Sequence, residues 1–282
     1  MKNYPYWRRV RGTDYGRIAE FLRLRENFCV AACAKFLKGD PSRDHVWAFD
    51  GAGGGTAAVL LHSRRALLPV FDGNRGIPLP AFLRRFLIKV PIRSVQGLRE
   101  DADILEEAMA ARGYRALESI DYDLMALDRE PPAEAFRSGP PDLVIRPPAG
   151  SDREAIFHLQ AAYEQEEVLP RDAVFNAAAS RLSLERALGC EQMLVAELGG
   201  VLVGKINTSA RSFTRCQIGG VFVRPDCRGM GIALRMGAVF FRALILGGSG
   251  ATLFVKKKNS AARALYRRLG FSALGDYRIS YY

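Results

Sequence analysis

Apolar positions in the first half of the chain recur with two different periods, which indicates a mixture of helices and strands. Residues 15–37 and 101–112 place apolar side chains at helical spacing, and Gly113 marks the end of the second run. Short apolar or alternating runs predict β-strands at residues 45–50, 56–61, 66–71 and 118–127. The glycine-rich turn at 51–55 predicts that the first two strands form a hairpin. The first half is therefore predicted to be an α/β domain.

The second half alternates more regularly between the two periods. Ser151 and Glu154 have the spacing of a capping box, so we expect a helix from there to about Tyr163. The other predicted elements are a strand at 143–146, a helix at 172–188, strands at 193–197, 201–207 and 217–223, a helix at 231–246, a strand at 251–255, a helix at 259–269 and a last strand to Tyr282. This order predicts an α/β fold with a central, mostly antiparallel sheet flanked by helices.

A polar, proline-rich stretch separates the two halves. Residues 128–142 contain four prolines and no apolar period, which is typical of a linker. A chain of 282 residues also exceeds one average domain. We therefore predict a first domain at residues 1–130, a linker at 131–141 and a second domain at 142–282.

The composition is that of a soluble globular protein, with 49% hydrophobic and 25% charged residues. No apolar run reaches the roughly 20 residues that span a bilayer. The sequence from Met1 to Arg9 lacks a hydrophobic signal segment, so we expect a cytoplasmic protein that does not enter the membrane. Five cysteines without a CxxC pair and three dispersed histidines predict neither a disulfide framework nor a metal site.

The formal net charge of +11 is concentrated in one part of the chain. Six lysines and arginines lie between residues 256 and 268, and no acidic residue occurs from Ala251 to Gly275. Positive charge of this kind is typical of proteins that bind nucleic acid, anionic membrane surfaces or phosphate-bearing ligands. Charge alone does not distinguish these ligands, although a local cluster fits a phosphate-bearing small molecule at least as well as a nucleic acid.

The segment from Val221 to Ala233 combines a strand, a short turn and glycines at the start of a helix. The first N–H groups of a helix have no partner within it, and the helix dipole is positive there. Gly229 and Gly231 allow a ligand to approach the backbone closely, and Arg228 adds a cation. The segment therefore predicts a diphosphate-binding turn. It contains neither GxxxxGK[ST] nor a complete GxGxxG.

Two motifs in order resemble those of a known family. Arg228-Gly-Met-Gly-Ile-Ala233 resembles the R/Q-x-x-G-x-G/A signature of the GNAT N-acetyltransferase superfamily. The run from Asn259 to Phe271 is similar to the family's second signature, N-x-x-A-x-x-x-Y-x-x-x-G-F. The resemblance covers residues 143–282. The first half has neither signature, and residues 74–80 contain two prolines where the corresponding helix would begin, but its element order is compatible with a degenerate copy of the same fold.

The resemblance implies acetyl-CoA as the cosubstrate. The strand that ends at Val223 would separate from its neighbour, and the pantetheine arm would insert between them. Gly219 and Gly220 give that strand the freedom to bulge. Main-chain groups of Val221 and Val223 would pair with the pantetheine amides. The implied cofactor-binding residues are Val221, Phe222, Val223, Arg228, Gly229, Met230, Gly231, Ile232, Ala233 and Asn259.

Tyr266 occupies the position of the family's general acid, where a phenol protonates the leaving thiolate. The alternative is that Tyr266 only packs its helix onto the sheet. The general base is less evident, because Gln217 stands near the position where many relatives have a glutamate, and an amide is not a base. Either water relays the proton or a carboxylate from Tyr163–Val168 does so. The candidates there are Glu164, Glu166 and Glu167, which could equally form a solvated helix end.

Lys205, Asn207 and Gln217 are candidate contacts for the acceptor substrate. The resemblance thus implies an N-acetyltransferase that transfers an acetyl group directly to a primary amine of a small molecule or peptide. The missing strand glutamate leaves open a non-catalytic acetyl-CoA-binding module. The net charge leaves open a modifier associated with ribosomes or nucleic acid. Neither nucleic acid nor a membrane is the expected partner, and a homodimer is compatible with the sequence.

Overall fold

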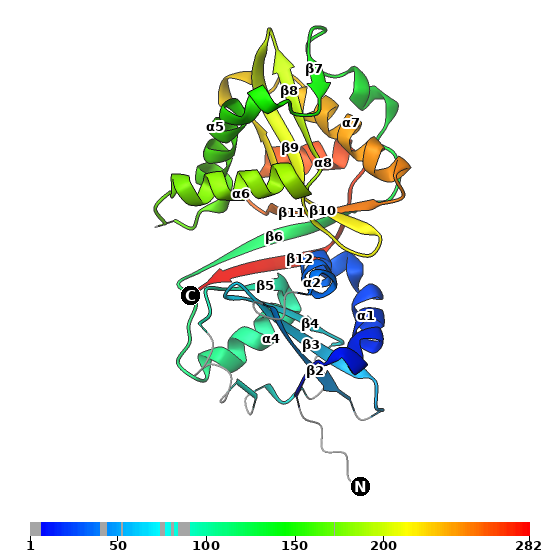
Figure 1. Ribbon diagram of the computed structural model, residues 1–282, viewed down its shortest axis with the longest axis vertical. Helices are drawn as coiled ribbons and strands as arrows, with labels where there is room; N and C mark the ends of the chain where they lie inside the picture. Colours follow the sequence, from blue (N-terminus) through cyan, green and yellow to red (C-terminus); the bar gives the residue numbers. More distant parts are fainter. Residues whose placement is uncertain are drawn as a thin grey trace. The chain divides into compact units, whose positions relative to one another are not determined.

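The computed structural model describes residues 7–39, 44–51, 53–73, 77–79, 82–83, 91–171 and 173–282. The chain forms two compact units, which are drawn in Figure 1. The first unit comprises Met1–Leu124 together with Leu274–Tyr282, and the second comprises Met125–Ala273. These boundaries differ from the sequence-based ones at the C-terminus, because the last residues of the chain join the first unit.

The first unit is built on a sheet of short strands. They are β1 (Arg8–Arg9), β2 (Asp44–Asp50), β3 (Thr56–Ser63), β4 (Ala66–Phe71) and β5 (Ser94–Leu98). Strands β1 to β4 are antiparallel neighbours, which confirms the predicted hairpin. In contrast, β5 runs parallel to β4 and pairs with it over two residues, Ala66 with Ser94 and Leu67 with Val95.

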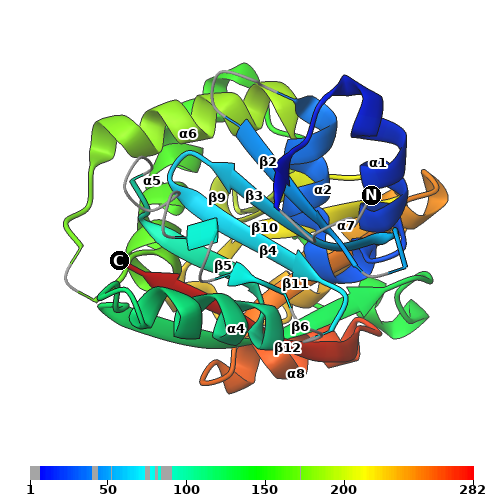
Figure 2. The same cartoon turned by 90° about the horizontal axis from the view of Figure 1, so that it is seen from below.

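Three described helices pack on this sheet: α1 (Tyr15–Arg23), α2 (Glu26–Lys38) and α4 (Arg99–Ala110). Helices α1 and α2 lie on one face and α4 on the other (Figure 2). The sequence predicted one helix at 15–37, but two form, because Arg25 between them has non-helical backbone angles (φ −114°, ψ 10°). This break places the Arg25 guanidinium 4.1 Å from the centre of the Phe21 ring.

The C-terminal strand β12 (Ser272–Tyr281) completes the sheet of the first unit. It pairs antiparallel with β5, from Tyr277 opposite Leu98 to Tyr281 opposite Ser94. Its other neighbour is β6 (Glu118–Leu127), where Ser119 and Ser280 share a 2.8 Å hydrogen bond. Strand β6 in turn ends in the second unit, beside β11. The first unit therefore contains a strand from the C-terminal end of the chain.

The second unit has the same order of strands as the first. Antiparallel strands β7 (Val144–Arg146), β8 (Met193–Leu198), β9 (Val201–Arg211) and β10 (Arg215–Val223) are followed by β11 (Gly250–Lys256), which runs parallel to β10. Its longer helices are α5 (Arg153–Tyr163), α6 (Ala177–Cys190), α7 (Ile232–Leu246) and α8 (Ser260–Arg268). Each predicted helix and strand of this half forms, with end points that shift by a few residues; residue 172, at the predicted start of one helix, lies outside the described part. The described helices include none long and apolar enough to cross a membrane.

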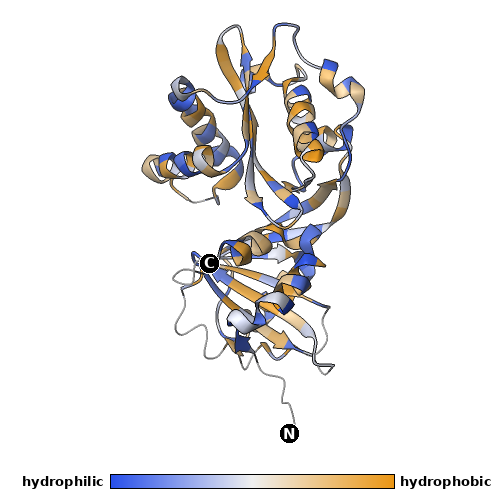
Figure 3. Ribbon diagram, turned by 45° about the vertical axis from the view of Figure 1, so that its right-hand side comes forward, coloured by the Kyte–Doolittle hydropathy of each residue, from blue (hydrophilic) through white to orange (hydrophobic). Residues whose placement is uncertain are grey.

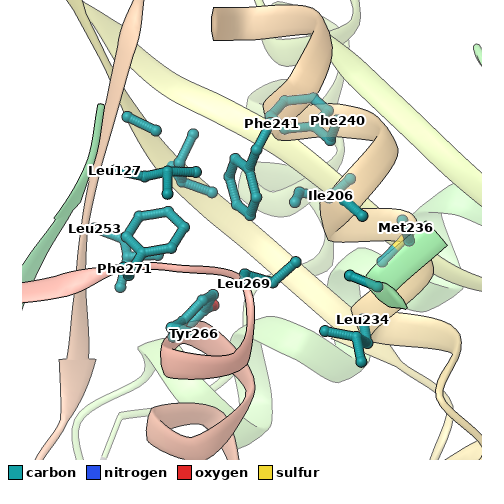
Figure 4. Packing of buried hydrophobic residues seen from close by; sticks show 14 of the residues in the cluster. Leu127, Ile206, Leu234, Met236, Phe240, Phe241, Leu253, Tyr266, Leu269 and Phe271 are labelled. Carbon is teal, nitrogen blue, oxygen red and sulfur yellow. The ribbon is translucent and has the colours of Figure 1, made fainter. Parts of the chain in front are cut away.

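Apolar residues of the second unit form a core on each face of its sheet. Figure 4 shows the core under α7 and α8, where Phe241 and Leu269 pack close to Phe271. On the other face, Ile156 of α5 and Leu184 of α6 are buried in a second cluster. In Figure 3 the strands are largely apolar, whereas the helices carry both apolar and polar residues. Burial of these two faces fixes the strands between the helices.

Two local predictions differ from the structure. The predicted linker forms a 3₁₀ turn at Ala133–Arg137, and Ala135 is buried in the core against α7, so this segment is part of the second unit. The predicted capping box of Ser151 and Glu154 does not form. A 3₁₀ turn precedes α5 instead, because the Asp152 carboxylate accepts the Ala149 N–H at 2.6 Å.

Candidate active site

The parallel strands β10 and β11 separate after three paired residues. Arg215, Cys216 and Gln217 pair with Gly250, Ala251 and Thr252, and the pairing then ends. On its other side, β10 stays paired with β9 as far as Val223 opposite Gly204. A bulge interrupts that ladder between Gly219 and Phe222. The described part of β10 beyond Gln217 therefore has an open edge toward β11.

A cleft of about 400 Å³, here called the β10–β11 cleft, lies at this open edge. It is lined by Glu166, Glu167, Val221, Phe222, Val223, Cys227, Arg228, Gly229, Gly231, Ile232, Ala233, Leu234, Asn259, Ala261, Ala262, Leu265, Tyr266 and Arg268. All predicted cofactor-binding residues except the half-exposed Met230 are among them. The structure thus brings together residues that lie far apart in the sequence.

The main chain of β10 presents two of its residues to the cleft. The Arg224 N–H donates to the Val203 carbonyl of β9 at 2.8 Å. Successive residues of a strand point their N–H and C=O groups to opposite sides. The N–H and C=O groups of Val223 and Val221 therefore point away from β9, toward the cleft. The Val223 carbonyl already accepts a hydrogen bond from Arg228 Nε at 3.0 Å.

The turn between β10 and α7 depends on two glycines in the left-handed region. Gly229 has φ +79° and Gly231 has φ +82°, which glycine adopts without steric cost. A Cβ atom on Gly229 would meet nothing within 4 Å, so the backbone is open to a ligand there. A Cβ atom on Gly231 would lie 2.8 Å from the backbone nitrogen of Gly139. The first N–H groups of α7 follow directly, which makes the turn suitable for an anion.

Two of the predicted general bases are paired with residues of the cleft wall. Both lie in a π-helical turn, Glu164–Val168, that follows α5. Glu166 Oε2 accepts from an Arg228 guanidinium nitrogen at 2.7 Å. Glu167 accepts from Asn259 Nδ2 at 3.0 Å and lies 3.3 Å from Lys256 Nζ. These carboxylates therefore occupy donors that a bound phosphate or amide would use.

Tyr266 and Asn259 both belong to α8. Asn259 caps the helix, because its Oδ1 accepts the Ala262 N–H at 3.0 Å. Tyr266 is buried and packs edge-to-face on Phe271, with ring centres 5.6 Å apart, while its side chain also lines the cleft. Burial raises the pKa of the Tyr266 phenol well above its usual value, so the hydroxyl stays protonated at neutral pH.

Comparisons with known proteins identify this arrangement. Residues 154–271 match the model of the acetyltransferase (GNAT) family. The second unit contains a GNAT domain. No curated protein sequence matches the chain.

The fold of the whole chain is similar to that of solved structures that include GNAT proteins. A tandem GNAT protein from the clavulanic acid biosynthesis pathway has a TM-score of 0.63 at 13% identity, covering 98% of each chain. A GCN5-related N-acetyltransferase from Sphaerobacter thermophilus has a TM-score of 0.59 at 21% identity, covering 99% of this chain and 96% of that one. A Drosophila protein has a TM-score of 0.68 at 14% identity, covering 99% of both chains. The predicted tandem GNAT-like fold is confirmed.

The parallel strands of the first unit also border a pocket. A pocket of about 670 Å³ lies at the ends of β4 and β5. Its charged lining residues are mostly acidic: Asp72, Glu100, Asp101, Asp103 and Asp276, with Arg25 and Arg99. Such a lining repels a diphosphate. Of the two prolines that the sequence analysis noted at residues 74–80, Pro78 is described and Pro80 lies outside the described residues.

The three predicted acceptor contacts lie outside the lining of the β10–β11 cleft. Gln217 Nε2 donates to Ser209 Oγ at 3.3 Å. Lys205 is fully buried and Asn207 is 8% exposed. Lys205 Nζ donates to Asn207 Oδ1 and to the Gly220 carbonyl, both at 3.0 Å. Lys205 and Asn207 therefore stabilise the bulge of β10 through the Gly220 carbonyl.

Sequence reasoning missed two contributors to the GNAT domain. The ring of Tyr163 lies 5.1 Å from Lys205 Nζ, and Gly139 of the predicted linker packs against Gly231. Tyr163 is the last aromatic residue of the apolar pattern of α5, and this position could have indicated its contact with Lys205. No local sequence pattern indicates the contact between Gly139 and Gly231. In the described part of the chain, no cluster of three or more His, Cys, Asp or Glu side chains could hold a metal ion.

Proposed function

We propose that the GNAT domain transfers the acetyl group of acetyl-CoA directly to a primary amine of a small molecule or peptide. The observation that supports this proposal is the β10–β11 cleft, which joins an open strand edge to an anion-binding helix start. The pantetheine amides pair with the main chain of Val221 and Val223. The diphosphate lies against the first N–H groups of α7, with Arg228 beside it.

In the proposed reaction, the amine nitrogen forms a bond to the thioester carbonyl carbon, and the electron pair of the C=O bond moves to oxygen. Collapse of this intermediate breaks the C–S bond and releases the thiolate of coenzyme A. Tyr266 donates a hydrogen bond to that sulfur from the wall of the cleft. Because the pKa of Tyr266 is raised, its hydroxyl stabilises the thiolate chiefly as a hydrogen-bond donor.

The amine must lose one proton, and the carboxylates that line the cleft are already paired. Glu166 holds Arg228, and Glu167 holds Asn259 and Lys256. Gln217 is an amide and lies outside the cleft lining. We therefore propose that the amine reacts in its neutral form and that water carries its proton away.

Calorimetry and turnover on the full chain test this function. Coenzyme A should bind with one molecule per chain, because the pocket of the first unit is acidic. Acetyl-CoA mixed with a panel of amines and peptides should release free thiol in proportion to an acetylated product. Binding without acetylated product for every acceptor would instead support a non-catalytic acetyl-CoA-binding module. Absence of binding would contradict the proposal, as would a stoichiometry of two.

Glu166→Gln should tighten the binding of coenzyme A about two- to five-fold. The carboxylate competes with the diphosphate for Arg228, and the amide does not carry its charge. The ion pair is 44% and 42% exposed, so it is worth no more than about 1 kcal/mol. Glu185→Gln removes a carboxylate that pairs with Arg153 outside the cleft lining and serves as the control. Weaker binding by Glu166→Gln would mean that this carboxylate supports the site.

A further inference from the structure

Lys205 is a fully buried lysine whose two hydrogen-bond acceptors are neutral. The residue has no exposed surface, and its ammonium donates to the Gly220 carbonyl and to Asn207 Oδ1. The centre of the Tyr163 ring lies 5.1 Å from the Lys205 nitrogen. Burial disfavours the charged ammonium and lowers the pKa of Lys205 to about 7, although the nearby Glu164 carboxylate opposes this shift. A methionine of similar length would fill this space at lower cost.

The bond to Gly220 orients the peptide group that this residue shares with Val221. Gly220 lies in the bulge of β10 with φ +61°, and a Cβ atom there would lie 2.5 Å from Lys205 Nζ. The described backbone contains no cis peptide bond. In a trans peptide the C=O and the following N–H point in opposite directions. Since the Gly220 carbonyl points to Lys205, the Val221 N–H points to the opposite side, where Val221 lines the cleft.

We propose that Lys205 is a positioning residue for acyl transfer. By holding the Gly220 carbonyl, it fixes and polarises the peptide whose N–H, on Val221, stabilises the negative charge that develops on the thioester oxygen. This inference rests on the proposed function. When Lys205 is protonated, its hydrogen bond to the Gly220 carbonyl is stronger than one between neutral groups and draws electron density from the peptide. The N–H on the other edge of that peptide becomes a better donor.

The neighbours of Lys205 keep its ammonium in place. Asn207 Oδ1 accepts one of its N–H bonds, and the Asn207 amide nitrogen donates to the Thr208 carbonyl at 2.8 Å, which fixes the orientation of the amide. On the neighbouring strands, Val195 and Phe222 lie opposite Lys205 in register. A side chain held on several sides loses little freedom when the intermediate forms, as preorganised electrostatic stabilisation requires.

Lys205→Met should lower kcat about 10- to 100-fold and leave the affinity for coenzyme A within three-fold of wild type. Removal of a complete oxyanion donor costs about 10²–10³, whereas here the Val221 N–H remains and loses only its orientation and polarisation. Lys205→Gln retains a neutral N–H donor, so its kcat should lie between those of wild type and Lys205→Met. Lys35→Met removes a lysine from α2 of the first unit and serves as the control. Turnover, coenzyme A titration and melting temperature are measured for each variant.

A second readout depends on binding alone. In acetyl-CoA labelled with ¹³C at the thioester carbonyl, the infrared C=O band of the bound ligand should lie below its frequency in water. Lys205→Met should return the band toward the solution value, and Lys205→Gln should do so partly. Equal bands in all three proteins, or a loss of kcat that matches an equal loss of coenzyme A affinity, would overturn the positioning role. Failure of the proposed function is distinguishable, because wild type would then bind or turn over nothing.

Discussion

Gly229→Asp is expected to weaken coenzyme A binding on the order of 100-fold. The new carboxylate would stand at the start of α7, beside the proposed position of the diphosphate. Two like charges about 5 Å apart repel by about 3 kcal/mol at an effective dielectric constant of about 20. A Cβ atom at this position meets nothing within 4 Å, so the substitution adds charge without a clash. Calorimetric titration measures the loss.

The matched control is Gly229→Asn. Asparagine and aspartate have the same shape, and both tolerate the left-handed φ of +79° at this position better than most residues. Gly231 is a poorer position for the test, because any side chain there would contact Gly139. Similar affinities of the Asp and Asn variants would show that the diphosphate binds elsewhere.

Tyr266→Phe is expected to lower kcat at least ten-fold and to leave coenzyme A affinity nearly unchanged. The hydroxyl acts when negative charge develops on the leaving sulfur, and an interaction made in the transition state appears in kcat. The phenylalanine ring preserves the packing on Phe271, so the melting temperature should stay close to that of wild type. Stopped-flow and steady-state rates with acetyl-CoA measure the effect.

The raised pKa of Tyr266 adds a pH test to this experiment. Because burial raises the pKa of the Tyr266 phenol above its usual value, the ratio of the wild-type rate to the Tyr266→Phe rate should not fall between pH 7 and pH 9. A ratio that declines over this range would contradict the assignment. Equal rates of the two proteins, with chemistry shown to be rate-limiting, would make Tyr266 a packing residue.

The conformation of the glycine turn before α7 was predictable because its causes are local. A strand, two glycines and a helix start within 13 residues are sufficient to specify it, and the structure places Gly229 and Gly231 as that pattern requires. The order of helices and strands was predictable for the same reason, since each element follows from the period of its own apolar residues.

The environments of the charged residues were not predictable in this way. A lysine is usually read as exposed, yet Lys205 is buried because the bulge of β10 brings the Gly220 carbonyl within 3.0 Å. The pairing of Glu166 with Arg228 joins residues 62 positions apart. Contacts of this range depend on the assembled fold, so no window of the sequence contains them.

Because β12 belongs to the sheet of the first unit, that unit cannot complete its fold until the end of the chain has been translated. The sheet of that unit lacks the partner of β5 until Leu274–Tyr282 have been synthesised, although its other strands are complete by Leu127. About 150 residues of the second unit lie between these segments. At 5–20 residues per second, the exposed edge of β5 waits roughly 8–30 s. The first unit is thus synthesised first, but its sheet is completed last.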